Sequence, residues 1–292
     1  MTATPRTILE TLLPSLRLAA GYARHIQSRI VAQPAKDGAN KFSSALTDAD
    51  LSVQTFVEVA LLGSFPTIRF YGEEYQQSYN TKYFRSIELG PQDDYLVTLD
   101  PIDGTLFYMD GLPNYLIILT VLNADEFEAV LAISPEEDRY FFALRGQGTH
   151  VAPLDKDLDD AAPLEISPTN TVFLASLMAP LRAKLDDRYA IISSSEDYSP
   201  NNVIPSTNGI LKGELAGAVL SKGQFIDGAA LAFLAREAGC IVTDHQGKAL
   251  PRLDECKDYC TPGIAIAATP EIHSDLIAAL EGFVPTASND GA

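Results

Sequence analysis

The sequence has few cysteines and few basic residues, and each shortage excludes a class of protein. Three cysteines in 292 residues argue against a disulfide framework and favour a reducing compartment, so we expect a cytoplasmic protein. Lysine and arginine number 21 against 39 acidic residues, which gives a formal net charge of −18. This charge disfavours binding to a nucleic-acid polymer or to an anionic membrane, because basic side chains supply the affinity for both.

The sequence also lacks a long apolar run, and its length suggests one or two domains. No stretch of about 18 apolar residues occurs, so no membrane-spanning helix is expected. The first 30 residues lack the order of a secretory signal. Residues 151–170 are rich in aspartate and proline, and we interpret them as a linker. We therefore predict an N-terminal α+β domain over 1–155, carrying most candidate metal ligands, and a C-terminal α/β domain over 156–292.

Apolar spacing predicts the secondary structure. Long helices are expected over 7–32 and 48–62, the second with an inward face formed by Leu51, Phe56, Val57, Ala60 and Leu61. Apolar runs predict strands at 68–71, 95–99, 116–122, 127–133 and 139–144. Beyond the linker, strands are expected at 171–175, 189–193, 240–243 and 264–267, and helices near 181 and at 208–214, 228–238 and 271–280. This alternation favours an α/β layered fold.

The segment Asp100-Pro-Ile-Asp-Gly-Thr105 follows an apolar strand and combines groups that suit a cation and a phosphate. The proline bars a regular helix at Asp100, so we expect the chain to turn sharply off the strand. Both carboxylates can then face one point, with the Ile102 carbonyl between them, and hard ions such as Mg²⁺ take oxygen ligands of this kind. Gly104 permits close backbone approach, and the threonine offers a hydroxyl and an N–H near a helix N-terminus.

Further acidic residues stand where predicted elements begin or end, at Asp50, Glu73, Glu74 and Asp227. Taken singly, each is more simply a solvated residue or a helix cap. Taken together, these carboxylates would repel one another if no cation paired with them. Two like charges about 4 Å apart cost about 4 kcal/mol at an effective dielectric constant of about 20. A bound metal ion is the natural counter-charge for such a group.

These motifs, in this order, resemble the inositol monophosphatase superfamily of Mg²⁺-dependent, lithium-sensitive phosphatases. The family also includes fructose-1,6-bisphosphatases and 3′(2′),5′-bisphosphate nucleotidases. Two family motifs are matched in full, by Gly72-Glu73-Glu74 and by Asp100 to Thr105; others are matched by Leu46 to Asp50, in part by Ile226 to Ala230, and by Glu237 to Cys240. The resemblance implies an α/β fold, a layered αβαβα sandwich, in a protein that is usually a homodimer and acts on a small-molecule phosphate ester.

The resemblance also implies a role for each matched residue. Two or three Mg²⁺ ions would bind, with Mn²⁺ as a substitute, and the ligands would be Glu73, Asp100, the Ile102 carbonyl, Asp103 and Asp227. Thr105 and Glu73 would activate the water that attacks phosphorus in line, and Asp50 would support Thr105. The N–H groups of Gly104 and Thr105 would hold the phosphate. Ser206 and Thr207 match the substrate segment of relatives loosely.

The substrate side departs from the family pattern. Leu106-Phe107 follows the hexapeptide where relatives often have a second polar or basic residue and then Asn-Phe, and Ile226 replaces a tryptophan. Leu220 stands where inositol-selective relatives have a glutamate. We expect a metal-dependent phosphomonoesterase, with polyol phosphates such as inositol 1-phosphate ranked before bisphosphate nucleotides and fructose 1,6-bisphosphate. Inositol 1-phosphate itself is expected to be a substrate but not the best one. The alternative class is a non-catalytic regulatory relative that binds metal or phosphate on the same scaffold.

Overall fold

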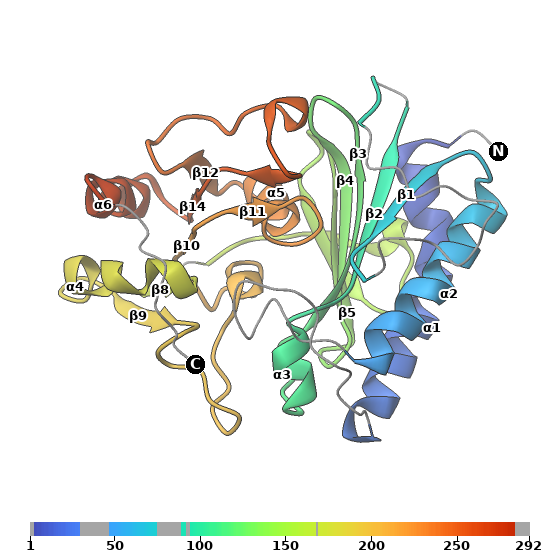
Figure 1. Cartoon of the computed structure of the whole chain (residues 1–292), viewed down its shortest axis with the longest axis horizontal. Helices are drawn as coiled ribbons and strands as arrows, with labels where there is room; N and C mark the ends of the chain where they lie inside the picture. Colours follow the sequence, from blue (N-terminus) through green and yellow to red (C-terminus); the bar gives the residue numbers. More distant parts are fainter. Residues whose placement is uncertain (1–2, 30–46, 75–88, 92–93, 168, 284–292) are drawn as a thin grey trace. The chain divides into compact units, whose positions relative to one another are not determined.

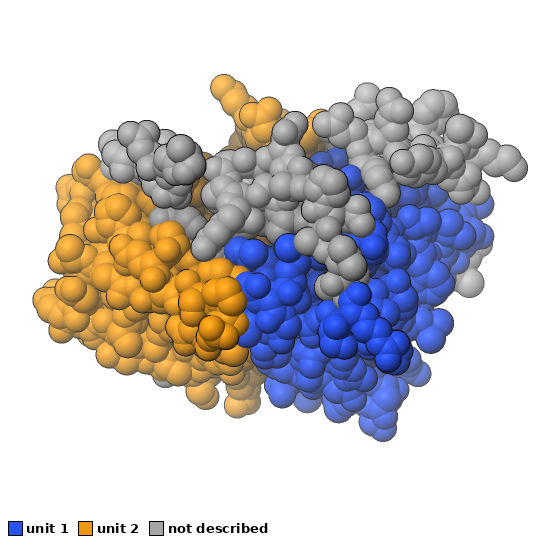
Figure 2. Space-filling model, turned by 60° about the horizontal axis from the view of Figure 1, so that its bottom comes forward, with its two compact units in different colours: residues 1–163 blue, residues 164–292 orange. Residues whose placement is uncertain are grey.

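The computed structural model describes residues 3–29, 47–74, 89–91, 94–167 and 169–283. The chain divides into two compact units, Met1–Pro163 and Leu164–Ala292, which Figure 2 shows in different colours. The domain boundary predicted between residues 155 and 156 stays a prediction. In the structure, residues up to Pro163 still pair with the sheet of the first unit.

The first unit is built on a seven-stranded sheet whose strands lie in sequence order. β1 runs parallel to β2, and every later neighbour pairs antiparallel. The strands are β1 (Arg69–Gly72), β2 (Leu96–Asp103), β3 (Leu116–Leu122), β4 (Phe127–Ser134), β5 (Arg139–Leu144), β6 (Thr149–Pro153) and β7 (Ala162–Pro163). The apolar runs thus predicted the first five strands well, although β2 is longer than expected.

The linker predicted over 151–170 is wrong in its first half. β6 pairs with β5 and β7 pairs with β6, with a 3₁₀ turn, η2 (Leu158–Asp160), between them. The composition misled because the segment forms the edge of the sheet. Aspartates are solvated there, and Pro163 sits on the edge strand, the place in a sheet that best tolerates a missing N–H.

Two helices, α1 (Pro5–Ile26) and α2 (Asp48–Ser64), pack together against the sheet (Figure 1). Along α1, apolar residues are buried at steps of three and four residues, at Ile8, Leu12, Leu16, Ala19 and Ala23. The helix predicted to reach residue 32 is α-helical only to Ile26 and tightens into a 3₁₀ turn, η1 (Gln27–Arg29). Near this end the Ala23 carbonyl accepts a hydrogen bond from outside the helix, from the Tyr108 hydroxyl. Residues 30–32 lie outside the described part of the chain.

The inward face predicted for α2 is partly wrong. Phe56 is 43% exposed, whereas three polar residues spaced by four, Asp50, Gln54 and Glu58, are buried beside the apolar ones. The apolar periodicity could not show this, because these polar side chains are buried for their hydrogen bonds and not for their hydrophobicity. Their stripe faces the end of β1, where the candidate site begins.

The second unit has a five-stranded sheet in the order β12-β14-β10-β8-β9. β8, β9 and β10 are parallel, and β14 is antiparallel to both of its neighbours. The strands are β8 (Thr171–Leu174), β9 (Ala190–Ser193), β10 (Gly217–Leu220), β12 (Ile241–Asp244) and β14 (Ile264–Ala267), with a separate pair, β11 (Gly223–Gln224) and β13 (Cys260–Thr261). β8, β9, β12 and β14 agree with the predicted strands, whereas β10, β11 and β13 were not predicted.

Helices cover both faces of this second sheet (Figure 1). α6 (Pro270–Leu280) packs on the face that carries Val219 and Ala265. α5 (Gly228–Glu237) begins against the opposite face, near Leu220. The helix predicted at 208–214 is instead a 3₁₀ turn, η4 (Thr207–Ile210), because the chain turns away through Gly213 at a φ of 72°. Other short elements are η3 (Ser176–Leu181), α4 (Arg182–Leu185) and η5 (Leu253–Glu255).

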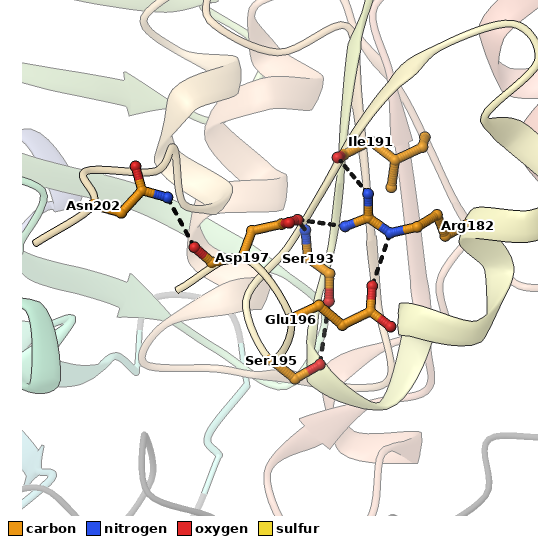
Figure 3. A network of polar contacts seen from close by, with 7 residues as sticks. All are labelled: Arg182, Ile191, Ser193, Ser195, Glu196, Asp197 and Asn202. Carbon is orange, nitrogen blue, oxygen red and sulfur yellow. Dashed lines mark hydrogen bonds and ion pairs between the residues drawn. The ribbon is translucent and has the colours of Figure 1, made fainter. Parts of the chain in front are cut away.

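A polar network fixes the turn that follows β9 (Figure 3). Arg182 bonds Glu196 at 2.8 Å, the Ile191 carbonyl at 3.1 Å, and the carboxylate of Asp197. That carboxylate also accepts the Ser193 N–H at 2.7 Å. Ser193 therefore lies in a turn that is braced by hydrogen bonds to Asp197. Of the helices that the structure describes, none is long and apolar enough to cross a membrane.

Candidate active site

A bulge in β2 places the first two candidate carboxylates on the same side of the sheet. β2 continues through Pro101 to Asp103, so the sharp turn predicted at the proline is wrong. Asp100 lies opposite Ile118 and Asp103 opposite Leu116, so three steps along β2 match two along β3. In a regular strand, residues three apart face opposite ways. The extra residue restores a common face, and a bulge also tolerates the N–H that proline lacks.

Glu73 reaches the same region from the neighbouring strand. β1 pairs in parallel with β2 up to Gly72 opposite Leu99, and the Glu73 N–H donates to the Leu99 carbonyl at 3.1 Å. The next residue of β2 is Asp100, so the two acidic residues follow paired positions. Gln54 fixes this corner, because its Oε1 accepts the Glu74 N–H at 2.8 Å and its side chain fills the space where a Cβ on Gly72 would lie.

Asp50 and Thr105 form a buried hydrogen-bonded pair. Asp50 is fully buried near the start of α2, where one of its oxygens accepts the N–H of Thr47 at 2.8 Å and the hydroxyl of the same residue. Its other oxygen lies 3.1 Å from Thr105 Oγ1, which also lies 2.9 Å from the Ile102 carbonyl oxygen. The hydroxyl has one proton for these two acceptors. When Asp50 is ionised and accepts that hydrogen bond, the lone pairs of the Ile102 carbonyl stay available to a cation.

Burial raises the pKa of Asp50 from an ordinary 3.8 to about 6, and the negative charge of Glu73 adds to the rise, against the hydrogen bonds that lower it. Glu73 and Asp50 are therefore close enough to repel each other. Negative charge gathers here without a basic side chain among the causes of this shift. A cation at this place would relieve the repulsion.

We expect Asp50 to make folding stability fall with rising pH. Because the pKa is raised on folding, the contribution of Asp50 to the free energy of unfolding is fully present below about pH 3.8 and is lost as the pH rises through about 6. Asp50→Asn carries an uncharged amide and lacks this change. The difference in unfolding free energy between wild type and variant should fall by about 3 kcal/mol from about pH 4 to about pH 7. Urea unfolding of both proteins in a chelator measures it, and a constant difference would contradict the raised pKa.

Gly104 lies between the end of β2 and the short helix α3 (Thr105–Met109). Gly104 has a φ of 91°, and a Cβ there would approach the Asn114 carbonyl oxygen to 3.1 Å. A side chain at this position would therefore be strained in conformation and crowded. The glycine is needed for the turn that starts α3.

The remaining predicted site residues, Asp227, Ser206 and Thr207, lie in the second unit. Asp227 caps α5, and its side chain accepts the Gly228 N–H. Ser206 donates to Asn208 Oδ1 at 2.9 Å ahead of the η4 turn that begins at Thr207. Asn208 was not singled out from the sequence, yet it is buried, and its Nδ2 has no hydrogen-bond partner among the described residues.

The donors that the first unit brings to one region are all oxygens. They are the carboxylates of Asp100 and Asp103 on one face, that of Glu73 directly after the adjacent strand, and the Ile102 carbonyl. No group of three or more His, Cys, Asp or Glu side chains in the described part of the chain stands ready to hold a metal ion. Mg²⁺ does not require such a group, because it keeps several waters and is usually held by one or two carboxylates together with substrate phosphates. The donor set fits this ion.

Comparison with known proteins defines the class. Residues 11–284 match the inositol monophosphatase family, so the chain belongs to that family and is a phosphatase. A probable inositol 1-monophosphatase of Mycobacterium tuberculosis, ImpA, is 28% identical over 242 residues, covering 79% of this chain and 80% of its own. The Nus factor SuhB of Xylella fastidiosa is 27% identical over 158 residues, covering 54% of this chain and 58% of its own.

Solved structures agree on the fold. An inositol monophosphatase (IMPase) from Thermotoga maritima superimposes with a TM-score of 0.71 at 18% identity, over 94% of this chain and 96% of its own. An IMPase/NADP phosphatase complexed with Mg²⁺ and phosphate gives a TM-score of 0.69 at 17% identity, over 96% and 97%. The α/β layered fold predicted from the resemblance is confirmed.

Proposed function

We propose that the protein is a Mg²⁺-dependent phosphomonoesterase that hydrolyses a small phosphorylated metabolite. The observation that carries this proposal is the bulge in β2, which turns Asp100 and Asp103 to one face beside the buried Asp50–Thr105 pair. A purely structural bulge would not need two carboxylates on the same side, where they repel. The Mg²⁺ and phosphate named for the structural neighbour support the same chemistry.

The residues that would hold Mg²⁺ are Glu73, Asp100, the Ile102 carbonyl and Asp103, with Asp227 as the predicted ligand from the second unit. When bound, the ion supplies Lewis acidity toward the phosphate oxygens and lowers the pKa of water. Two or three ions, with Mn²⁺ as a substitute, and a homodimer are further parts of the proposal.

The other residues of the first unit act on water and on the phosphate. Thr105 accepts a hydrogen bond from the attacking water and, with Glu73, orients it. Its own hydroxyl donates a hydrogen bond to Asp50, whose Oδ1 lies 3.1 Å away. The N–H groups of Gly104 and Thr105 hold the phosphate. Asp50 therefore acts through Thr105 and keeps its hydroxyl in one orientation.

Two apolar positions lower the expected rank of inositol 1-phosphate within its substrate class. Leu220 and Ile226 are both 5% exposed, and Leu220 packs against the start of α5. Neither side chain can bond a polyol hydroxyl, and a buried hydroxyl without a partner costs about 1–3 kcal/mol. The loss of one such contact weakens binding by about 5- to 150-fold. Polyol phosphates stay first as a class, with inositol 1-phosphate a substrate but not the best.

A phosphate-release screen tests this function. Some dozens of phosphorylated metabolites, among them inositol 1-phosphate, bisphosphate nucleotides and fructose 1,6-bisphosphate, are assayed with Mg²⁺ and again in excess chelator. We expect metal-dependent release and a higher kcat/KM for another ester than for inositol 1-phosphate. Release that persists in chelator would overturn the metal mechanism. Inositol 1-phosphate as the best substrate would overturn the specificity argument alone.

We expect lithium to inhibit the enzyme in the millimolar range, because the matched carboxylates imply that Li⁺ can take a metal position. Phosphate release is measured at limiting Mg²⁺ while LiCl is raised to about 100 mM, with KCl as the control for ionic strength. Full activity in LiCl, with equal activity in KCl, would count against this arrangement of ligands.

The alternative is a regulatory relative without catalytic activity, and the likeness to a Nus factor favours it. The phosphate-release screen, combined with a binding assay, distinguishes the two functions. A regulatory relative would bind Mg²⁺ or phosphate in a binding assay and yet release no phosphate from any ester. Retention of all the matched carboxylates favours the enzyme.

A further inference from the structure

The end of α1 and the short helix α3 cap each other. The hydroxyl of Tyr108, in α3, donates to the Ala23 carbonyl oxygen at 2.7 Å. In return, the side-chain amide of Gln27 donates to the carbonyl oxygens of Tyr108 at 3.1 Å and Leu112 at 3.0 Å. Carbonyls in the last turn of a helix lack partners within it, and the Tyr108 hydroxyl gives one such carbonyl of α1 a donor from outside the helix. The Tyr108 carbonyl of α3 accepts the Gly111 N–H at 3.0 Å and the Gln27 amide as a second donor. We call the three bonds made by the Tyr108 hydroxyl and the Gln27 amide the α1–α3 clamp.

One backbone hydrogen bond connects the clamp to the candidate site. The Tyr108 N–H donates to the Gly104 carbonyl oxygen at 3.0 Å, so the residue that bonds α1 also holds the backbone of Gly104. Tyr108 is fully buried and packs edge-on against Tyr115, with ring centroids 4.8 Å apart. The position of its ring is therefore well defined, and its hydroxyl points at α1.

α3 needs such support from outside. It has five residues, and isolated helices shorter than about 12 residues are marginal in water. The positions of Gly104 and Thr105 thus depend on what holds α3. The clamp bonds join residues 81 and 85 apart in the sequence, so they attach α3 to a long, well-packed helix.

We propose that Tyr108 and Gln27 are positioning residues that set the place of Gly104 and Thr105 in the active site. This inference rests on the proposed phosphatase function. Neither side chain touches the reacting atoms; each acts through α3. Orientation of a hydroxyl matters most in the transition state, so loss of the clamp lowers kcat more than it raises KM.

The decisive comparison is between two buried tyrosines whose hydroxyls bond carbonyls in different parts of the first unit. Tyr140 is also fully buried, and its hydroxyl donates to the Lys156 carbonyl oxygen at 3.0 Å, away from α3. Tyr108→Phe and Tyr140→Phe therefore remove the same kind of bond. We expect kcat to fall about 10-fold in Tyr108→Phe, since small displacements of reacting groups are costly, and to stay near wild type in Tyr140→Phe. Gln27→Met, which keeps the length without the amide, should behave like Tyr108→Phe.

Amide hydrogen exchange gives a readout that needs no activity. Exchange over residues 104–109 should be about 10-fold faster in Tyr108→Phe than in wild type, and unchanged in Tyr140→Phe. If an active wild type and Tyr108→Phe share the same kcat, or if both tyrosine variants lose it equally, the inference is wrong. If wild type releases no phosphate from any ester, the proposed function fails. Hydrogen exchange then tests the positioning role of the clamp without any activity measurement. Equal exchange rates over residues 104–109 in wild type and Tyr108→Phe would refute that role.

Discussion

Asp100→Asn is expected to abolish metal-dependent phosphate release, with kcat lower by about 10³-fold or more. Asp100 is buried at the bulge and is one of the carboxylates that the family resemblance assigns to the metal ions. Loss of its charge removes several kcal/mol of stabilisation, and each 1.36 kcal/mol is about tenfold in rate. The fold should survive, because Asp100 Oδ1 accepts the Ile102 N–H at 3.1 Å and an asparagine oxygen can do the same.

Asp244→Asn is a matched control for this prediction. Asp244 Oδ1 also accepts the N–H two residues ahead, from Gln246 at 2.8 Å, but it lies at the end of β12 and has no assigned role in the site. Activity should be retained in Asp244→Asn and lost in Asp100→Asn, while both variants keep the circular dichroism and melting profile of a folded protein. A folded Asp100→Asn with undiminished phosphate release would refute the role of Asp100.

Thr105→Val should lower kcat by about 10²–10³-fold, and Thr105→Ser should keep activity within about tenfold of wild type. Valine has nearly the shape of threonine but no hydroxyl to orient water. It also leaves the buried Asp50 Oδ1 without its partner at 3.1 Å, so the variant should lose about 1–3 kcal/mol of stability. Steady-state kinetics and urea unfolding measure the two effects separately.

Thr98→Val separates the catalytic effect from the loss of stability. The Thr98 hydroxyl is buried in the same strand, β2, and bonds the Thr120 hydroxyl at 2.7 Å. Its removal also leaves a buried polar group unpaired, yet it touches none of the predicted site residues. We expect similar destabilisation and near-normal kcat in Thr98→Val. Equal losses of kcat in Thr98→Val and Thr105→Val would mean that Thr105 matters only for folding.

The local motifs of the site could be predicted from the sequence because their chemistry lies within a few residues. Asp100 to Thr105 is contiguous, and the structure shows its carboxylates, carbonyl and glycine in one continuous segment. Asp50 lies far along the chain, and only the family resemblance paired it with Thr105. The structure brings the two to 3.1 Å across 55 residues.

The periodicity of apolar residues could not predict which polar side chains are buried. Gln54 is 1% exposed and holds the corner at Gly72 and Glu74, yet a polar residue gives no apolar signal to find it. Phe56, which does give one, is exposed. Gln27 and Tyr108 were missed for a related reason, since their partners lie far away in the sequence and no motif links them.

The sequence by itself determined the positions of most strands along the chain, the α/β class and the identity of the site segment, because apolar runs and short motifs depend on neighbours along the chain. Only the tertiary structure decided the register of β2 against β3. That register inserts one residue at Pro101–Ile102 and so turns Asp100 and Asp103 to the same face. The physical reason is that register is set by pairing with another strand and by the packing of both faces, and neither is written in the strand's own residues.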